Sequence, residues 1–249
     1  MDEKVKLLFI VTAHESNDCV EDTIHNIKKF NTDVIPLIAI HASEKFRDFD
    51  EVRFSNIENV TFVRNQAKTF DSRWESLLLP ILKTYQFAKR RFGEKFDYVK
   101  IFHTSELFVR HGFYDYIKQY DTSFDSRTDE LPQRYWPIFE MGVFKQTEPI
   151  FYQGVELGFF NKEIMDKIEN ACFSEFPVSC EQINNFFNYT PIEEVVMPTI
   201  AMRYAKRVGR NVNVMKPDIE NINLEGSLFT IKSIPRDINH PVRMKVREL

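Results

Sequence analysis

Hydrophobic and polar positions follow two rhythms in the first half of the chain. Residues 5–13 form a continuous apolar run, a pattern typical of a strand that is covered on both faces, and residues 33–42 and 97–103 are also predicted to be buried strands. Between these runs, apolar residues recur at helical spacing over residues 20–30 and again over residues 74–88. This alternation of strands and helices predicts a mostly parallel α/β sheet flanked by helices.

Smaller signals refine the prediction for the first half. A short apolar run at residues 59–64 predicts one more strand. The helix predicted over residues 74–88 contains Pro80, which either kinks the helix or marks its true start. Gly93 then predicts the end of that helix.

The second half of the chain is less regular. Residues 150–160 predict a strand that leads through a glycine-containing turn into a helix over residues 162–171. A Thr-Pro pair followed by acidic residues predicts a helix from about Ile192, because negative charge at a helix start favours the helix dipole. Residues 121–146 are polar and aromatic-containing, and we interpret them as a lid or acceptor loop. We expect one domain over residues 1–249.

Composition and charge argue against several classes of protein, including nucleic-acid-binding proteins and proteins that bind phosphate with a Gly-rich loop. The chain has only 7 glycines and no Gly-rich phosphate loop, and its net charge of −4 gives nucleic-acid binding no support. Cys19, Cys172 and Cys180 lack metal-ligand spacing, so we expect reduced thiols. The first apolar run is too short for a signal peptide or a membrane span. We therefore expect a soluble cytoplasmic protein, with contact to the inner-membrane surface left open.

Polar residues follow the predicted strands. Residues 12–15, 41–44 and 103–106 lie at carboxyl ends of strands, where ligands of parallel sheets bind. The tail contains the densest basic cluster of the chain, with Arg236, His240, Arg243, Lys245 and Arg247. This tail could be a solvated chain end without a binding role, or it could contact anionic lipid.

The order of six segments resembles a known enzyme family. "LLFIVTAHES", "LIAIHASEK", "SRWESLLLPILKTY", "FDYVKIFHTSELF", "YQGVELGFFNKEIMDKI" and "EEVVMPTIAMR" look like successive blocks of the core-2/I-branching type β-1,6-N-acetylglucosaminyltransferases, glycosyltransferase family 14. The resemblance covers residues 7–203, and the whole chain is similar in length to bacterial members of the family. It implies a GT-A-like fold with a Rossmann-like nucleotide-sugar-binding half over residues 1–110 and an acceptor half over residues 111–249. It also implies inverting sugar transfer without a required metal or other cofactor.

The resemblance suggests catalytic and charge-neutralising residues. Glu194 matches the family's general base, which removes the proton of the acceptor hydroxyl, and Glu193 is its neighbour or substitute. The alternative is that both are ordinary first-turn acids of a helix. Without a metal, basic residues must neutralise the leaving diphosphate. Arg243 and Lys245 are the first candidates, with Arg236 behind them.

The resemblance also suggests residues for donor binding. His14, Ser105 and Glu106 are expected to line the donor site, with Glu106 standing where the family has Asp. Ser43 replaces a nucleotide-contacting Asp of the family. The resemblance implies UDP-GlcNAc as the first donor to consider, whereas the replacement of that Asp by Ser43 leaves the base, uridine included, and the sugar open. Each of these side chains has a structural alternative, such as a turn or helix cap.

The expected partners are a nucleotide-sugar donor and a glycan or lipid-linked glycan acceptor, as in bacterial surface polysaccharide synthesis, and no nucleic acid. Glu156 and Trp136 are the acceptor-binding candidates. Two alternatives stay open. One is a catalytically silent nucleotide-sugar or glycan-binding protein of the same fold. The other is a metal-dependent glycosyltransferase that uses Asp48 and Asp50, which we interpret first as a solvated loop.

Overall fold

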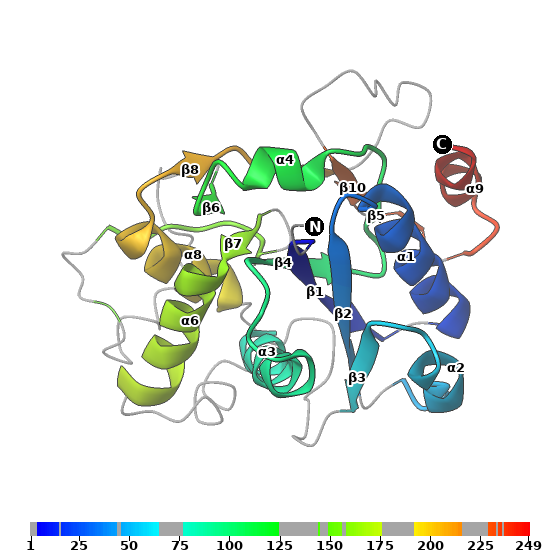
Figure 1. Cartoon of the computed structure of the whole chain (residues 1–249), viewed down its shortest axis with the longest axis horizontal. Helices are drawn as coiled ribbons and strands as arrows, with labels where there is room; N and C mark the ends of the chain where they lie inside the picture. The colour runs from blue at the N-terminus through cyan, green and yellow to red at the C-terminus, as the bar shows by residue number, and fades with distance from the viewer. Residues whose placement is uncertain are drawn as a thin grey trace.

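A seven-stranded sheet forms the centre of the molecule, with helices on both faces (Figure 1). The computed structural model describes residues 4–14, 16–43, 46–64, 77–124, 144, 149–155, 158–175, 192–215, 229–232, 234–235 and 237–249. Within these residues, no helix combines the length and the apolar character needed to cross a membrane.

The first half of the sheet is parallel, as predicted. Strands β1 (Lys6–Ala13), β2 (Ile35–Ala42), β3 (Val60–Arg64) and β4 (Tyr98–His103) lie in the order β3-β2-β1-β4. Between β1 and β2 the chain forms helix α1 (Asn17–Phe30). The short helix α2 (Glu51–Ser55) precedes β3, and helix α3 (Leu78–Phe92) precedes β4.

The second half of the chain extends the same sheet. Strands β6 (Thr122–Ser123), β7 (Phe160–Asn161) and β8 (Val208–Gly209) complete the order β3-β2-β1-β4-β7-β6-β8. Numbered along the chain within this sheet alone, the spatial order is 3-2-1-4-6-5-7. β7 is antiparallel to both of its neighbours, whereas β6 and β8 are parallel to each other. The predicted fold class, α/β with a mostly parallel sheet flanked by helices, is confirmed.

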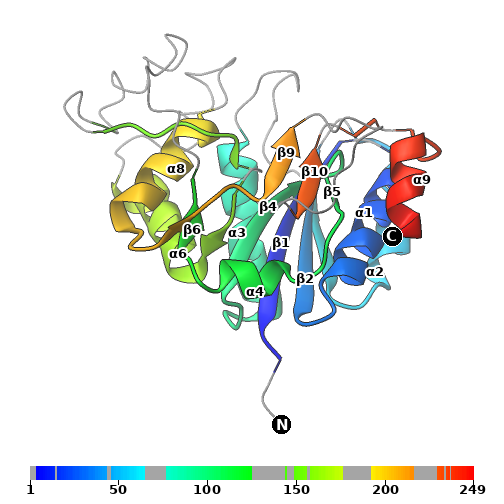
Figure 2. The ribbon, with the colours of Figure 1, turned by 90° about the horizontal axis from the view of Figure 1, so that it is seen from above.

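A small second sheet covers part of one face. It contains β5 (Leu107–Phe108), β10 (Thr230–Lys232) and β9 (Asn213–Met215), in the order β5-β10-β9. Helices α1, α2, α4 (Phe113–Ile117) and α9 (Pro241–Glu248) lie on this same side, and α9 packs beside α1 (Figures 1 and 2). Helices α3, α6 (Lys162–Asn170) and α8 (Glu193–Tyr204) cover the opposite face.

The two cores explain the continuous apolar runs. On β1, Leu8 and Ile10 belong to the core beneath α3, α6 and α8, whereas Leu7 and Phe9 belong to the core beneath α1 and α9. Because successive residues of a strand point to opposite faces, a strand buried on both faces must be apolar throughout. The Phe9 ring contacts those of Phe102 and Phe108 edge-on, at centroid distances of 6.2 and 5.9 Å.

Helix predictions were largely confirmed. α3 begins at Leu78, so Pro80 lies in its first turn, where a missing amide costs little, and the helix ends at Gly93 with φ +70°. α6 and α8 match the helices predicted from residue 162 and from about residue 192.

The strand predicted over residues 150–160 is wrong for residues 150–155 and 158–159, which lie in no strand, and β7 begins at Phe160; residues 156 and 157 lie outside the described residues. The amide of Phe151 donates to the Thr199 hydroxyl, and the amide of Gln153 donates to the Glu194 carbonyl. The backbone amides of Phe151 and Gln153 therefore bond to helix α8 instead of to a neighbouring strand.

Candidate functional site

The parallel strands bring their polar carboxyl ends to one edge of the sheet. From β1 the chain continues to β2 and β3 on one side, and it then returns to β4 on the other side of β1. Such a topological switch point is where ligands of open α/β sheets bind. In Figure 2 this edge lies opposite the N-terminus, at the far end of β1. The pair β1 and β4 therefore defines the candidate site.

A row of histidines marks this edge. Thr12 of β1 lies in register with His41 of β2 on one side and with His103 of β4 on the other. His14 follows two residues later on the same face of β1, and its ring lies 5.1 Å from that of His103, centroid to centroid. His14 was predicted to line the donor site, whereas His103 was predicted only as part of the polar strand end at residues 103–106 and was given no role of its own.

His103 is oriented by the turn that follows it. Its Nδ1 accepts a hydrogen bond from the Ser105 amide at 3.2 Å and lies 2.8 Å from the Ser105 hydroxyl oxygen. Accepting at Nδ1 places the proton of the neutral ring on Nε2, which makes that nitrogen a donor. Ser105, a predicted donor-binding residue, is therefore next to the candidate site and holds His103.

A cavity of about 570 Å³ lies at the start of α1. His14, Ser16, Phe46, Arg47 and Asp48 are among the residues that line it. Its floor is fixed, because the Ser16 hydroxyl accepts from the Cys19 amide and caps α1, and the Asn17 side chain donates to the Asp48 carbonyl at 2.7 Å. The cavity combines hydrogen-bonding groups, an aromatic edge and a helix N-terminus beside the switch point.

The two arginines of this cavity differ in their surroundings. Arg53 forms ion pairs with Asp18 and Glu21, and its hydrogen bond to Glu21 is the main reason that its pKa is raised. Arg47 is exposed, and among the described residues no acidic side chain pairs with it. Arg47 is thus the cation of this cavity that can contact a ligand; it was not predicted, because it lies among other charged residues of a loop.

Glu106 does not reach the candidate site. Its side chain is 0% exposed, and its Oε1 lies 3.0 Å from Nζ of Lys100, which is also 0% exposed. Burial raises the pKa of Glu106 and lowers that of Lys100, and their mutual attraction opposes both shifts. The expectation that Glu106 contacts a donor is corrected here, because a fully buried ion pair beneath the turn leaves no surface for a ligand.

Arg243 is also a structural residue. It is 0% exposed, and its guanidinium donates to the Asp22 carboxylate at 2.8 Å and to the carbonyls of Thr104 and Pro235 at 2.6 and 2.9 Å. These bonds tie α9 to α1 and to the turn after β4. The expectation that Arg243 neutralises a diphosphate is therefore corrected, since its donors are used within the fold. Lys245 is exposed on α9.

The two predicted catalytic glutamates have different environments. Glu193 is 4% exposed, and its Oε2 accepts from the Leu77 amide at 3.0 Å. Because Leu77 is the N-cap of α3 and has no side-chain cap of its own, Glu193 caps that helix from α8. Glu194 is half-buried at the same helix start. Of the two, Glu194 has the exposure that a general base needs.

The remaining predicted residues are placed as follows. Ser43 is half-buried, and its amide extends the pairing of β2 with β1 by donating to the Ala13 carbonyl at 2.9 Å. Asp50 caps α2 by accepting from the Arg53 amide. Arg236, Glu156 and Trp136 lie outside the described residues. Across the part of the chain that the structure describes, no group of three or more His, Cys, Asp or Glu side chains is arranged to hold a metal.

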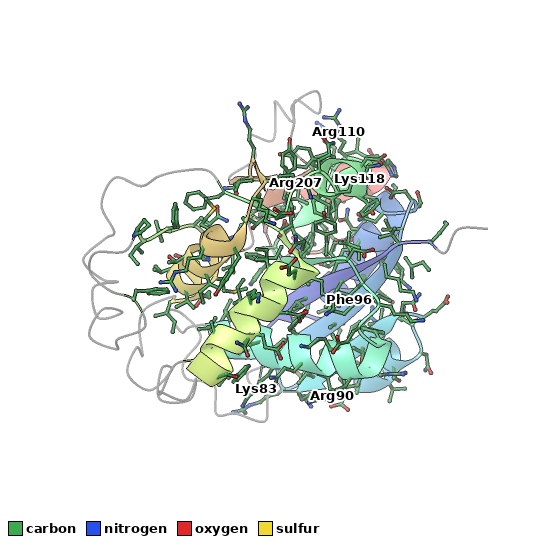
Figure 3. All side chains as sticks on the ribbon, turned by 60° about the vertical axis from the view of Figure 1, so that its left-hand side comes forward. Lys83, Arg90, Phe96, Arg110, Lys118 and Arg207 are labelled. Atoms are coloured by element: carbon green, nitrogen blue, oxygen red, sulfur yellow. The ribbon has the colours of Figure 1, made fainter. Side chains whose placement is uncertain are left out.

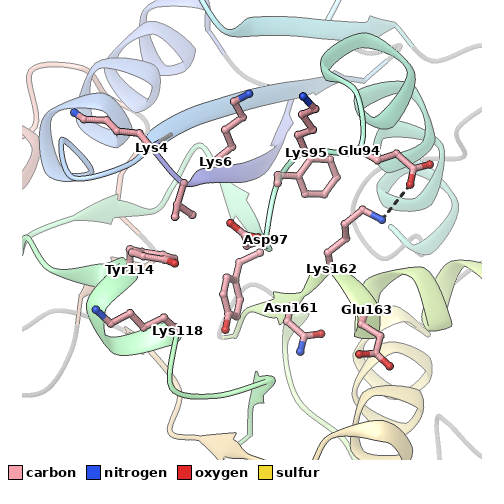
Figure 4. Close-up of a pocket in the computed structure, with 13 residues that line it drawn as sticks. Lys4, Lys6, Glu94, Lys95, Asp97, Tyr114, Lys118, Asn161, Lys162 and Glu163 are labelled. Atoms are coloured by element: carbon pink, nitrogen blue, oxygen red, sulfur yellow. Dashed lines mark hydrogen bonds and ion pairs between the residues drawn. The ribbon is translucent and has the colours of Figure 1, made fainter. Parts of the chain in front are cut away.

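A cavity of about 700 Å³ lies at the opposite, amino edge of the sheet (Figure 4). Lys4, Lys6 and Lys95 lie along one side of it, and Asp97 lies between them and Lys118. Lys118 is already paired with Asp115 outside the cavity. This cavity is distant from the switch point, so we place the candidate site at the carboxyl edge.

No protein-family model and no curated protein sequence matches this chain. The function is therefore argued from the fold, the carboxyl-edge geometry and the resemblance of the sequence blocks.

Proposed function

We propose that this chain is a metal-independent, inverting glycosyltransferase that transfers a sugar from a nucleotide-sugar donor to a glycan acceptor. UDP-GlcNAc is the first donor to test, and bacterial surface polysaccharide synthesis in the cytoplasm is the setting that the resemblance implies. The observation that carries the proposal is the polar cavity at the start of α1, beside the switch point between β1 and β4. The mostly parallel sheet is compatible with a GT-A-like fold.

The donor would occupy the carboxyl edge. A helix N-terminus favours an anion because its free amides and its dipole point toward the ligand, and α1 presents such an end to the cavity. Arg47 would contact the diphosphate, while His14 and His103 would donate to it as it leaves. These three residues replace Arg243 in the role that the resemblance had suggested.

The acceptor hydroxyl would be activated by Glu194. In the proposed step, the hydroxyl proton moves to the Glu194 carboxylate as the oxygen bonds to the anomeric carbon. The bond from that carbon to the diphosphate oxygen breaks on the opposite face, so the configuration inverts. The half-buried position of Glu194 supports this role over Glu193, whose carboxylate caps α3.

One alternative function is favoured by specific observations. The resemblance placed Glu106 and Arg243 in the donor site. Each of them instead forms a buried ion pair within the fold, Glu106 with Lys100 and Arg243 with Asp22. A catalytically silent protein that binds a nucleotide sugar or a glycan would also use the same edge of the sheet. The test must therefore measure binding and transfer separately.

The experiment compares Glu194→Gln with Glu193→Gln. Donor hydrolysis, sugar transfer and thermal stabilisation are measured across a panel of nucleotide sugars, each with and without EDTA. The proposal predicts that Glu194→Gln loses at least 100-fold in rate, on the order of general-base catalysis, but keeps nucleotide stabilisation. Glu193→Gln retains an amide oxygen for the Leu77 amide, so it should keep most activity.

Three outcomes would contradict the proposal. Wild-type rates in Glu194→Gln would remove the assigned base. Stabilisation by a nucleotide with no hydrolysis or transfer of any donor would favour the silent binding protein, and stabilisation that disappears in EDTA would favour a metal-dependent enzyme.

A further inference from the structure

A second groove of about 540 Å³ lies between the edge strand β3 and helix α3. Its α3 wall is formed by Lys83, Gln86, Phe87 and Arg90, which follow the spacing i, i+3, i+4, i+7 and therefore share one face of the helix. Its sheet wall is formed by the ends of β2 and β3, including His41 and Arg64. The groove thus begins at the histidine row of the candidate site and runs outward along α3.

The groove is cationic although the chain carries a net charge of −4. Among the described residues that line it, Arg64, Lys83 and Arg90 are cationic and Glu51 alone is acidic. Arg64 is anchored, because it donates to the Phe46 carbonyl at 2.9 Å and pairs with Glu51 at 3.4 Å. The groove therefore carries a net positive charge at its outer wall.

Lys83 and Arg90 are the two cations that a ligand can meet. Both are exposed, and within the described residues neither forms an ion pair. Figure 3 shows both on the outer side of α3. A helix rises about 1.5 Å per residue, so the two positions are roughly 10 Å apart along the axis. Half-buried Phe87 and Gln86 lie between them and offer a ring face and an amide.

We propose that this groove binds an extended acidic glycan, so that the acceptor of the proposed transferase carries carboxylate or phosphate groups along its chain. That the bound glycan is the acceptor rests on the proposed function. The binding of an acidic glycan in the groove does not depend on it. Two separated cations suit anionic groups spaced along a chain, whereas Phe87 between them suits a sugar ring.

The test is calorimetric binding of hexagalacturonate, a carboxylated glycan, with neutral maltohexaose, hexaglutamate and a six-nucleotide DNA as competing ligand classes. We expect hexagalacturonate to bind most tightly, and its affinity to fall between 50 and 500 mM salt because exposed charges are screened. Replacement of one exposed cation should weaken binding about threefold, and the double variant Lys83→Ala/Arg90→Ala about tenfold.

Arg91→Ala is the matched control for Arg90→Ala, because Arg91 is the next residue of α3, is exposed and does not line the groove. It should leave the Kd unchanged. Phe87→Leu keeps apolar bulk but removes the ring, so it should weaken hexagalacturonate about threefold and leave hexaglutamate unaffected. Circular dichroism of each variant verifies that the fold is retained.

Several results would overturn the inference. One is that hexagalacturonate does not bind at 50 mM salt. Another is that Arg90→Ala and Arg91→Ala lose equal affinity for it, and a third is that hexaglutamate or DNA binds more tightly than hexagalacturonate. Thermal stabilisation by nucleotide sugars, measured in the same variants, should be unaffected. If that stabilisation occurs without hexagalacturonate binding, the groove inference fails alone; if hexagalacturonate binds but no nucleotide does, the transferase proposal fails and the groove stands.

Discussion

Glu106→Gln separates a structural role of this residue from a role in ligand binding. The substitution keeps the size and shape of the side chain but removes its negative charge. In the folded protein, Lys100 then loses the partner that lies 3.0 Å away in a fully buried position. The nearby Lys232 also loses an attractive neighbour, because Glu106 raises the pKa of Lys232. We therefore expect a large loss of stability and no direct loss of ligand contacts.

The distance sets the scale of the effect. Two unit charges 3.0 Å apart attract by about 5.5 kcal/mol at an effective dielectric constant near 20, before desolvation is counted. Breaking one side of a buried pair costs about 3–5 kcal/mol, because the other charge is left uncompensated. Replacing both members by apolar residues, Lys100→Met/Glu106→Leu, should restore most of that loss, since paired burial itself contributes little net stability.

The assay is urea denaturation at pH 7 of the wild type, Glu106→Gln and the double variant. We expect an unfolding free energy lower by about 3–5 kcal/mol in Glu106→Gln, with near recovery in the double variant. The thermal stabilisation that a saturating nucleotide sugar gives to each protein should be unchanged. A loss below about 1 kcal/mol together with weakened nucleotide binding would contradict the structural role of Glu106 and indicate that it contacts the ligand.

Three further predictions test other contacts. Arg243→Met should lower the unfolding free energy by about 3 kcal/mol in urea titrations, whereas Lys245→Ala, exposed on the same helix, should change it by less than about 0.5 kcal/mol; equal effects would contradict the structural role of Arg243. Glu193→Ala should cost about 1 kcal/mol of stability because α3 loses its cap, and an unchanged thermal midpoint would show that this bond contributes nothing. Burial lowers the pKa of Lys232 to about 8 from 10.5, so the unfolded state binds more protons between these values and stability should rise with pH across this window by up to about 3 kcal/mol. Lys232→Met should abolish that rise in unfolding free energy, and an identical pH profile in both proteins would exclude the assignment.

The first half of the fold was predictable because its signals are long. Residues 5–13 and 33–42 became β1 and β2 almost without change, since every residue of a doubly covered strand packs into one core or the other. β6, β7 and β8 each have two residues, and two residues carry no periodicity. Their place is set by pairing, such as Thr122 with Phe160, which sequence spacing does not reveal.

The candidate site was predictable only in part. His14 and the turn that orients His103 were predicted from their positions at the carboxyl ends of strands. These ends lie at the same edge of a parallel sheet, where ligands bind. Arg243 and Glu106 were misplaced because burial of a charge depends on a partner that the sequence does not mark. The partner of Arg243, Asp22, lies 221 residues away. The helix that carries Arg243 was also missed, although buried Val242 and Val246 at helical spacing precede and follow it.

The proposed function requires that a nucleotide sugar binds at the carboxyl edge without a metal. The most direct test is calorimetric binding of UDP, UDP-GlcNAc and other nucleotide sugars in EDTA, to the wild type and to Arg47→Ala, with Arg91→Ala as the control. We expect one nucleotide to bind in EDTA, Arg47→Ala to weaken its binding about threefold to tenfold, and Arg91→Ala to leave its binding unchanged. No binding of any nucleotide, or binding that Arg47→Ala leaves intact, would contradict the proposed function.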